Sequence, residues 1–200
     1  MTSLPTTRTV RIAGLVAAPA AVLVSGLIVA QTSYSAFSST TENTANNWSA
    51  GSVELTDDDS GSALFAATDL QPGSTGENCI TVSSASSLDE DIRFYAANAG
   101  TTNGLSDHLE LTVTQGDGGG FGSCAGFTAL ASNASVYTGT LAELATNSTD
   151  YATGLGSWSH DDAASATRTF KIEYRLADTA PNTAQDGTAT VDLTWEAQSI

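Results

Sequence analysis

Basic residues are scarce in this chain of 200 residues, which has six lysines and arginines against 22 aspartates and glutamates. The formal net charge at pH 7 is therefore −16. Nucleic acid and anionic lipid are themselves negatively charged, so a surface of this kind repels both. We expect neither of them as a partner. Such a charge instead suits a soluble extracellular protein.

Long apolar stretches are equally rare, and the one long run lies near the N-terminus. Residues 12–30 contain no charged side chain and follow Arg8 and Arg11, which is the pattern of a secretory signal. A permanent membrane helix is the alternative, because the run is nearly long enough to span a bilayer. Pro19 in the middle of the run, and the absence of Lys or Arg just beyond it, favour the signal.

Small residues after this run indicate where the signal is removed. Ser33 and Ser35 satisfy the small-x-small rule, which predicts a signal peptide over 1–35 and a mature protein that begins at Ala36. The secreted chain would have four basic residues against 22 acidic ones, a net charge of −18. No stable membrane span would remain after cleavage.

Cysteine and histidine occur only twice each, as Cys79, Cys124, His108 and His160. Two thiols are too few ligands for structural zinc, and an even number of cysteines in an exported chain favours a disulfide. We expect Cys79 to be bonded to Cys124, which would stabilise the fold by about 4 kcal/mol through loop closure. Two free buried cysteines are the alternative.

The sequence also lacks the usual motifs of catalytic sites. It has no G-x-S-x-G nucleophile turn, and His108 is not followed by the glutamate of a zinc-peptidase helix. His160 precedes two aspartates and is interpreted as a solvated loop residue. The acidic run at 57–59 has neither the spacing nor the terminal glutamate of an EF-hand, and indicates an exposed turn. We therefore expect no enzyme activity, no cofactor and no metal.

Short alternating segments dominate the rest of the chain. Apolar and polar residues alternate most clearly over 91–98, 108–115, 167–177 and 187–198, which predicts strands with one buried face. Weaker candidates for strands are 52–55, 63–70, 78–84 and 135–139. The segment 140–146 is the one expected helix, Pro72-Gly73 indicates a tight turn, and the glycine-rich segment 116–126 indicates a loop. This pattern predicts an all-β, jelly-roll-like antiparallel β-sandwich over 47–200.

Four segments, in order, resemble the TasA/camelysin family of secreted bacterial proteins. The first is the junction at Ala36, "AFSSTTENTANNWSAGSVELTDD", and the second is "LQPGSTGENCITVSSASSLDEDIRFYA" at 70–96. The third is the strand candidate at 167–177, and the fourth is "TATVDLTWEAQ" at 188–198. The middle of the chain, 99–160, has no counterpart in the family pattern.

This resemblance implies a subunit that is released by a signal peptidase of the SipW type and polymerises with itself into extracellular biofilm-matrix fibres. In such fibres each N-terminal arm completes the sheet of the next subunit, which is donor-strand complementation. An accessory or anchor protein of the matrix would be a further partner. Some camelysin-type members are described as metallopeptidases, but this sequence lacks a zinc motif. The two cysteines are another departure from the family.

The expected donor arm is 36–46, where Phe37 is the single large apolar side chain. In an extended strand Phe37, Ser39 and Thr41 share one face, so Phe37 would fill a pocket and set the register. We expect the arm to be mobile in a lone subunit, because it has too little apolar area to dock on its own domain. A plain disordered leader is the alternative.

A second interpretation of the whole chain is an extracellular module that binds glycans or surfaces. It would use exposed aromatic side chains, for which Trp48, Trp158 and Tyr137 are the candidates. A camelysin-like peptidase is a third, weaker interpretation.

Overall fold

The computed structural model of this chain describes residues 52, 54–160 and 165–200. The expected signal peptide and donor arm lie outside these residues, so the cleavage site at Ser35 and Ala36 and the arm residues Phe37, Ser39 and Thr41 stay predictions. The described residues form nine strands and one short α-helix. The strands are β1 (Leu55–Asp57), β2 (Thr75–Ser84), β3 (Glu90–Thr101), β4 (Leu109–Asp117), β5 (Thr128–Ala129), β6 (Ser135–Thr140), β7 (Leu155–His160), β8 (Ala166–Leu176) and β9 (Ala189–Ser199).

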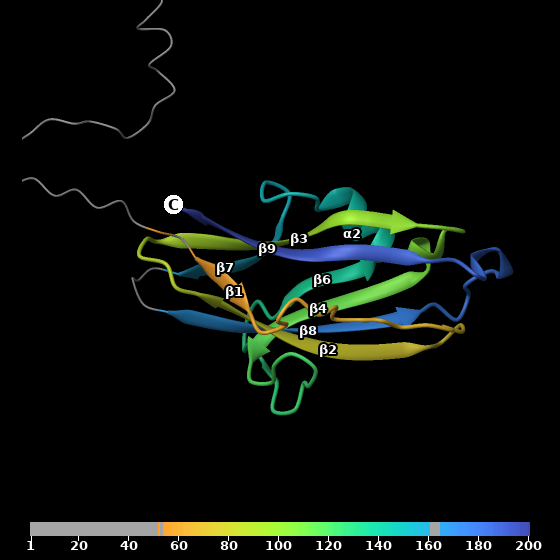
Figure 1. Ribbon diagram of the computed structural model, residues 1–200, viewed down its shortest axis with the longest axis horizontal. Helices are drawn as coiled ribbons and strands as arrows, with labels where there is room; N and C mark the ends of the chain where they lie inside the picture. Colours follow the sequence, from red (N-terminus) through yellow and green to blue (C-terminus); the bar gives the residue numbers. More distant parts are fainter. Residues whose placement is uncertain (1–51, 53, 161–164) are drawn as a thin grey trace, which may run out of the picture. The chain divides into compact units, whose positions relative to one another are not determined.

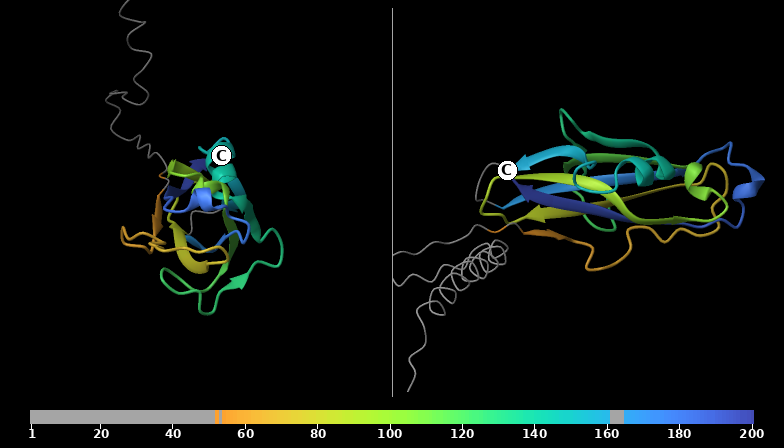
Figure 2. Two further views of the ribbon diagram at one scale, coloured as in Figure 1. Left: turned by 90° about the vertical axis from the view of Figure 1, so that its right-hand side faces the viewer. Right: turned by 90° about the horizontal axis from the view of Figure 1, so that it is seen from above.

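The strands form two antiparallel sheets that pack face to face (Figure 1 and Figure 2). The larger sheet has the order β1-β2-β8-β4, and both β5 and β6 pair with β4. The smaller sheet has the order β7-β3-β9. In Figure 1 the β3 and β9 layer lies above β2, β8 and β4. The expected antiparallel β-sandwich is thus confirmed.

The core lies between the sheets and comes from the alternating inner faces of their strands. Ile80 of β2, Phe94 of β3, Val113 of β4 and Ile172 of β8 are each 4 % exposed or less. Alternation places every second side chain of a strand on the same face, so each of these strands buries one face. The predicted strands at 78–84, 91–98, 108–115, 135–139, 167–177 and 187–198 are therefore confirmed as β2, β3, β4, β6, β8 and β9.

The expected helix is present as α2 (Leu141–Asn147). The Thr140 side chain accepts a hydrogen bond from the Glu143 backbone N–H, and the Glu143 side chain accepts one from the Thr140 N–H, which is a capping box. Leu141 and Leu144 bury one face of the helix in the core. The Pro72-Gly73 turn is also confirmed, since Ser74 N donates to Gln71 O at 2.8 Å.

Two predictions about the strands were wrong, and a third, at 52–55, overlaps the observed strand β1 only at Leu55. The segment 63–70 forms no strand, although its apolar residues Leu64 and Phe65 pack on the core. Asp69, with φ of 55°, has left-handed backbone that interrupts an extended run. The strand β7 was missed, and it places the backbone of His160 at a strand end rather than in a loop.

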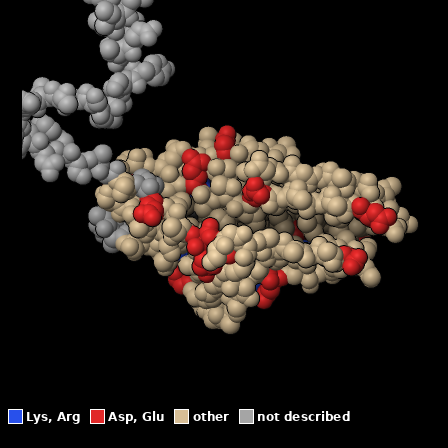
Figure 3. Space-filling model, in the orientation of Figure 1, with Lys and Arg blue, Asp and Glu red and all other residues tan. Residues whose placement is uncertain are grey.

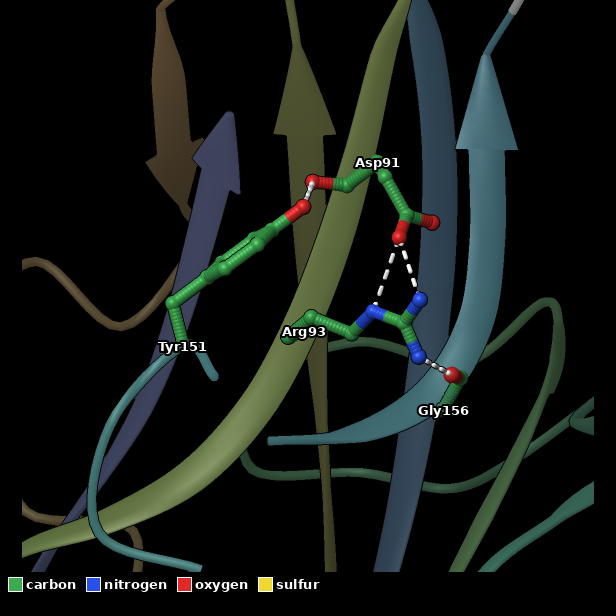
Figure 4. Close-up of polar contacts among 4 residues, drawn as sticks. All are labelled: Asp91, Arg93, Tyr151 and Gly156. Atoms are coloured by element: carbon green, nitrogen blue, oxygen red, sulfur yellow. Dashed lines mark hydrogen bonds and ion pairs between the residues drawn. The ribbon is translucent and has the colours of Figure 1, made fainter. Parts of the chain in front are cut away.

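The pairing of β7 with β3 is irregular and is held by a polar cluster (Figure 4). The register shifts between Ile92 and Phe94 of β3. Beside this shift, the Arg93 guanidinium donates to Asp91 Oδ2 at 2.8 Å and, through its NH1 group, to the Gly156 carbonyl at 2.9 Å. The Asp91 carboxylate raises the pKa of Arg93, so the guanidinium stays charged. One side chain thus joins the two strands where regular pairing fails.

Candidate functional site

The last strand, β9, has an apolar inner face that the rest of the domain leaves partly uncovered. Five of its side chains alternate toward the core, and every one is only partly buried: Ala189, Val191, Leu193, Trp195 and Ala197. Its neighbour β3 has the same alternation, yet the inner residues Ile92, Phe94 and Ala96 are at most 2 % exposed. The two strands differ in their neighbours. β3 is flanked by β7 and β9, whereas β9 pairs, within the described part of the chain, with β3 alone.

A groove of about 1420 Å³ lies beside this open edge. One wall is β9 from Ala189 to Trp195, and the other is the coil 61–72 between β1 and β2. This coil runs along the sandwich as the orange and yellow trace in Figure 1. The groove is larger than the 300–1,000 Å³ of typical small-molecule pockets, so its size suits a stretch of polypeptide.

The floor of the groove consists of core side chains from the larger sheet and from α2. The apolar residues that reach it are Ile80, Leu109, Leu111, Leu141, Ile172, Tyr174 and Leu176. Two of them, Leu109 and Tyr174, stay partly exposed although they lie on inner faces. The groove is therefore a gap in the hydrophobic core, and apolar surface left there in contact with water favours burial by another segment.

The coil wall is anchored by side chains instead of a backbone ladder. The Phe65 ring packs edge-on against Tyr174 with ring centroids 5.2 Å apart. The Asn78 amide donates to the Leu64 carbonyl at 2.7 Å. This coil forms no strand. Of the two described walls of the groove, only β9 therefore offers a strand edge for backbone pairing.

Trp195 is the last residue of the β9 wall. Its ring lies between Phe94 and Phe170, with centroid distances of 5.2 and 5.0 Å. Its buried indole N–H has no hydrogen-bond partner among the described residues. An unpaired buried donor costs about 1–3 kcal/mol, so a carbonyl oxygen that reached it would stabilise the protein.

Carboxylates surround the groove. Asp59, Asp69, Asp186 and Asp192 are among its lining residues. On the face drawn in Figure 3, aspartates and glutamates are spread over the surface while lysines and arginines hardly reach it. An inserted segment must therefore carry little negative charge.

The disulfide predicted from the cysteine count is present between Cys79 and Cys124. It joins β2 to the glycine-rich segment between β4 and β5, which is a loop as expected. The run at 57–59 was interpreted only as an exposed acidic turn. That description misses Asp58, whose carboxylate accepts hydrogen bonds from two backbone N–H groups of other segments.

The other residues singled out from the sequence do not come together. His108 lies at the end of a short 3-10 turn, Leu105–Asp107, before β4. Trp158 is only 5 % exposed and packs near Phe170, so its assignment as an exposed aromatic was wrong. Tyr137 is half-buried, and its hydroxyl donates to the Thr140 carbonyl at 2.6 Å. Trp48 lies outside the described residues.

The described residues lack two further features, a metal-binding cluster and a membrane-spanning helix. They contain no cluster of three or more histidine, cysteine, aspartate or glutamate side chains suited to a metal ion. None of their helices has the length and apolar character needed to cross a membrane.

The chain was also compared with known proteins. It matches no model of a protein family, and a search of curated proteins finds no match either.

Proposed function

We propose that this protein is a secreted structural subunit that polymerises into extracellular fibres, as the resemblance to the TasA/camelysin family implies. The sandwich is of the jelly-roll type, and the N-terminal arm of one subunit inserts beside β9 of the next. The observation that carries this proposal is the partly exposed inner face of β9 beside a strand edge that pairs with no other strand in the described part of the chain. Fibres of this kind belong to the cell surface or the extracellular matrix.

The dimensions of the groove suit the arm. The β9 wall from Ala189 to Trp195 covers six residue steps, or about 20 Å at about 3.3 Å per residue. The arm 36–46 covers ten residue steps and would span about 33 Å when extended, so it is long enough to fill the groove with residues to spare. The main chain of the arm would pair with the open edge of β9.

The composition of the arm suits the groove as well. Phe37 is its one large apolar side chain, and Glu42 is its one charged side chain. Burying the phenylalanine ring contributes about 1.5–3 kcal/mol per junction, and the many junctions of a filament add to each other. A nearly uncharged arm also avoids repulsion from the carboxylates around the groove, which include Asp69 and Asp192.

The experiment is electron microscopy of the purified mature chain that begins at Ala36. We expect filaments from this chain and none from Phe37→Asp. On the groove side, Leu193→Asp places a charge on the inner face of β9 and should abolish filaments. Gln198→Asp changes an exposed residue on the other face of the same strand, outside the groove lining, and should not.

A mixing experiment separates donor from acceptor. Phe37→Asp has an intact groove and Leu193→Asp has an intact arm, so an equimolar mixture should give pairs of subunits but no filaments. If the mature chain gives only monodisperse particles, or if Phe37→Asp still polymerises, the proposal is wrong. Monomers whose arm resists proteolysis would indicate that the arm fills the groove of its own subunit.

A further inference from the structure

The outer edge of β2 pairs with β1 only at Val82, Ser83 and Ser84, and closer to the start of β2 a loop covers it. Along β2, Ile80 and Val82 point into the core, so Cys79 and Thr81 point to the other face of the sheet. Cys79 is nevertheless completely buried. The disulfide to Cys124 holds the loop 118–126 over it, and this loop is the green segment below β2 and β8 in Figure 1.

The same loop lies along the backbone of β2. Phe121 and Cys79 form an isolated parallel β-bridge, so the loop occupies a position where a neighbouring strand would pair. A Cβ atom at position 120 would lie 2.9 Å from Asp58 Oδ2, so a larger residue there would displace this carboxylate. The disulfide is therefore the covalent link that keeps the loop at this edge.

Two side chains complete the cover by accepting hydrogen bonds from backbone N–H groups. Asp58 Oδ1 accepts from Thr81 N at 2.8 Å, and Asp58 Oδ2 accepts from Phe121 N at 2.8 Å. Asn78 Oδ1 accepts from Cys79 N at 2.9 Å and from Gly122 N at 3.0 Å. In an antiparallel pair the N–H groups of alternate residues point to opposite sides, so the N–H groups of Cys79 and Thr81 point away from β8. An incoming strand would need these two groups.

We propose that the disulfide-tethered loop 118–126, together with Asp58 and Asn78, is an edge guard that prevents β2 from pairing with a second copy of this chain. The inference rests on the proposed function, because a fibre that grows only at β9 needs its other edges closed. Unprotected edge strands pair with one another readily. Without the guard, the β2 edges of two copies would pair across a two-fold axis.

The test uses the mature chain with Phe37→Asp, so that growth through the groove does not interfere. It compares this chain with the same chain carrying Cys79→Ser and Cys124→Ser. We expect amide exchange at residues 79 and 81 to become at least about tenfold faster, while Ile80 and Val82, which face β8, keep their protection. We also expect concentration-dependent dimers by size-exclusion chromatography with light scattering.

Two further variants keep the test decisive. Adding Thr81→Pro to the cysteine-free chain removes the N–H group needed for pairing and should restore the monomer. Asp58→Ala keeps the disulfide, frees the Thr81 N–H and should also speed its exchange. Asp89→Ala is the matched control, an exposed carboxylate with no side-chain hydrogen bond among the described contacts, and should change nothing.

The guard is contradicted if the cysteine-free chain stays monomeric or if exchange at Thr81 is unchanged. It is also contradicted if Ile80 and Val82 lose protection together with Thr81, since the disulfide would then stabilise the whole domain only. Failure of the proposed function gives different results, namely filaments from the chain with Phe37→Asp and an intact disulfide, or monodisperse particles from the unsubstituted mature chain.

Discussion

Single polar residues inside this sandwich depend on single partners. Glu90, the first residue of β3, is completely buried, and one of its carboxylate oxygens accepts a hydrogen bond from the Ser84 hydroxyl. The other oxygen has no partner among the described residues. A buried carboxyl group that loses its last hydrogen bond is costly, while replacing both partners by apolar groups is often nearly neutral.

We therefore predict that Ser84→Ala lowers the free energy of unfolding by about 1–3 kcal/mol. The double variant Ser84→Ala with Glu90→Leu should recover most of this loss, because no polar group is then left unpaired. Urea denaturation followed by circular dichroism measures both. Ser83→Ala, the half-buried neighbour on the other face, is the control and should stay within about 0.5 kcal/mol of the parent. Equal losses in the single and double variants would contradict this account.

At the scale of the element, side chains on neighbouring strands interact across the strand pairs and add to the backbone hydrogen bonds. On the outer face of the larger sheet, Glu77 of β2 lies directly opposite Glu173 of β8. Lys171 lies between these like charges, with its ammonium 2.9 Å from Glu77 and 3.1 Å from Glu173. The hydrogen bonds that Lys171 donates to Glu77 and, to a smaller extent, to Glu173 raise the pKa of Lys171 above its ordinary value of 10.5.

The pH dependence follows from this direction. A lysine pKa that is higher in the folded state stabilises the fold below the ordinary value of 10.5, and the contribution is lost as the pH rises through the folded pKa. We predict that Lys171→Met lowers the melting temperature at pH 8, and that the difference from the parent disappears as the pH rises above 10.5 and through the folded pKa. The pair is partly exposed, so the loss at pH 8 should stay near or below about 1 kcal/mol. A difference that is constant with pH would contradict the prediction.

The β7 edge makes a second element-scale prediction. Arg93 links β3 to β7 at the irregular pairing through the Gly156 carbonyl, and Asp91 of its own strand accepts from the same guanidinium. Arg93→Met should therefore speed amide exchange throughout β7 and leave β2 and β8 unchanged. The control is Arg175→Met, because Arg175 makes only exposed ion pairs, with Glu110 and Asp178. Unchanged exchange in β7 would mean that the cluster contributes nothing to this edge.

At the scale of the whole molecule, charge opposes self-association. The mature chain would carry −18, so two copies repel each other over distances set by the ionic strength. The contacts that favour a fibre junction, strand pairing and burial of Phe37, act only at short range. Assembly must therefore overcome repulsion before these contacts form.

We predict that filament growth by the mature chain is slow at about 0.01 M salt and at least tenfold faster at about 0.5 M. The reason is that the screening length falls from about 30 Å to a few ångströms over this range. Light scattering after dilution into each buffer measures the growth, and an uncharged solute at equal osmolarity is the control. Growth that slows as salt is added would mean that attraction between opposite charges, and not burial of the arm, drives association.

Much of the fold could be predicted because it depends on local patterns. Strict alternation identified β4, β8 and β9, a proline-glycine pair identified the turn before β2, and the cysteine count identified the disulfide. The pattern was weaker at β7, where Gly156 and two serines leave only Leu155 and Trp158 to indicate a strand. At 63–70 the apolar residues indicated a strand, but they pack on the core from a coil.

The candidate site was harder to predict, because it is defined by what lies next to an element. The alternation of Val191, Leu193 and Trp195 was visible in the sequence, but it is the same whether a strand is central or at an edge. Asp58 likewise resembled any exposed acidic residue, since the N–H groups that it accepts from are contributed by Thr81 and Phe121, far away in the chain.

The sequence by itself therefore determined the strands with strong alternation, the crosslink, the acidic surface and the sandwich class, since each follows from composition or from neighbouring residues. Only the tertiary structure decided which strand edge is open and which is covered. Strand order brings β9 to one edge of its sheet without a second partner among the described strands, while β1, the loop from β4 and the carboxylate of Asp58 close the edge of β2. The physical reason is that edge exposure depends on contacts between segments far apart in the chain, which no local pattern encodes.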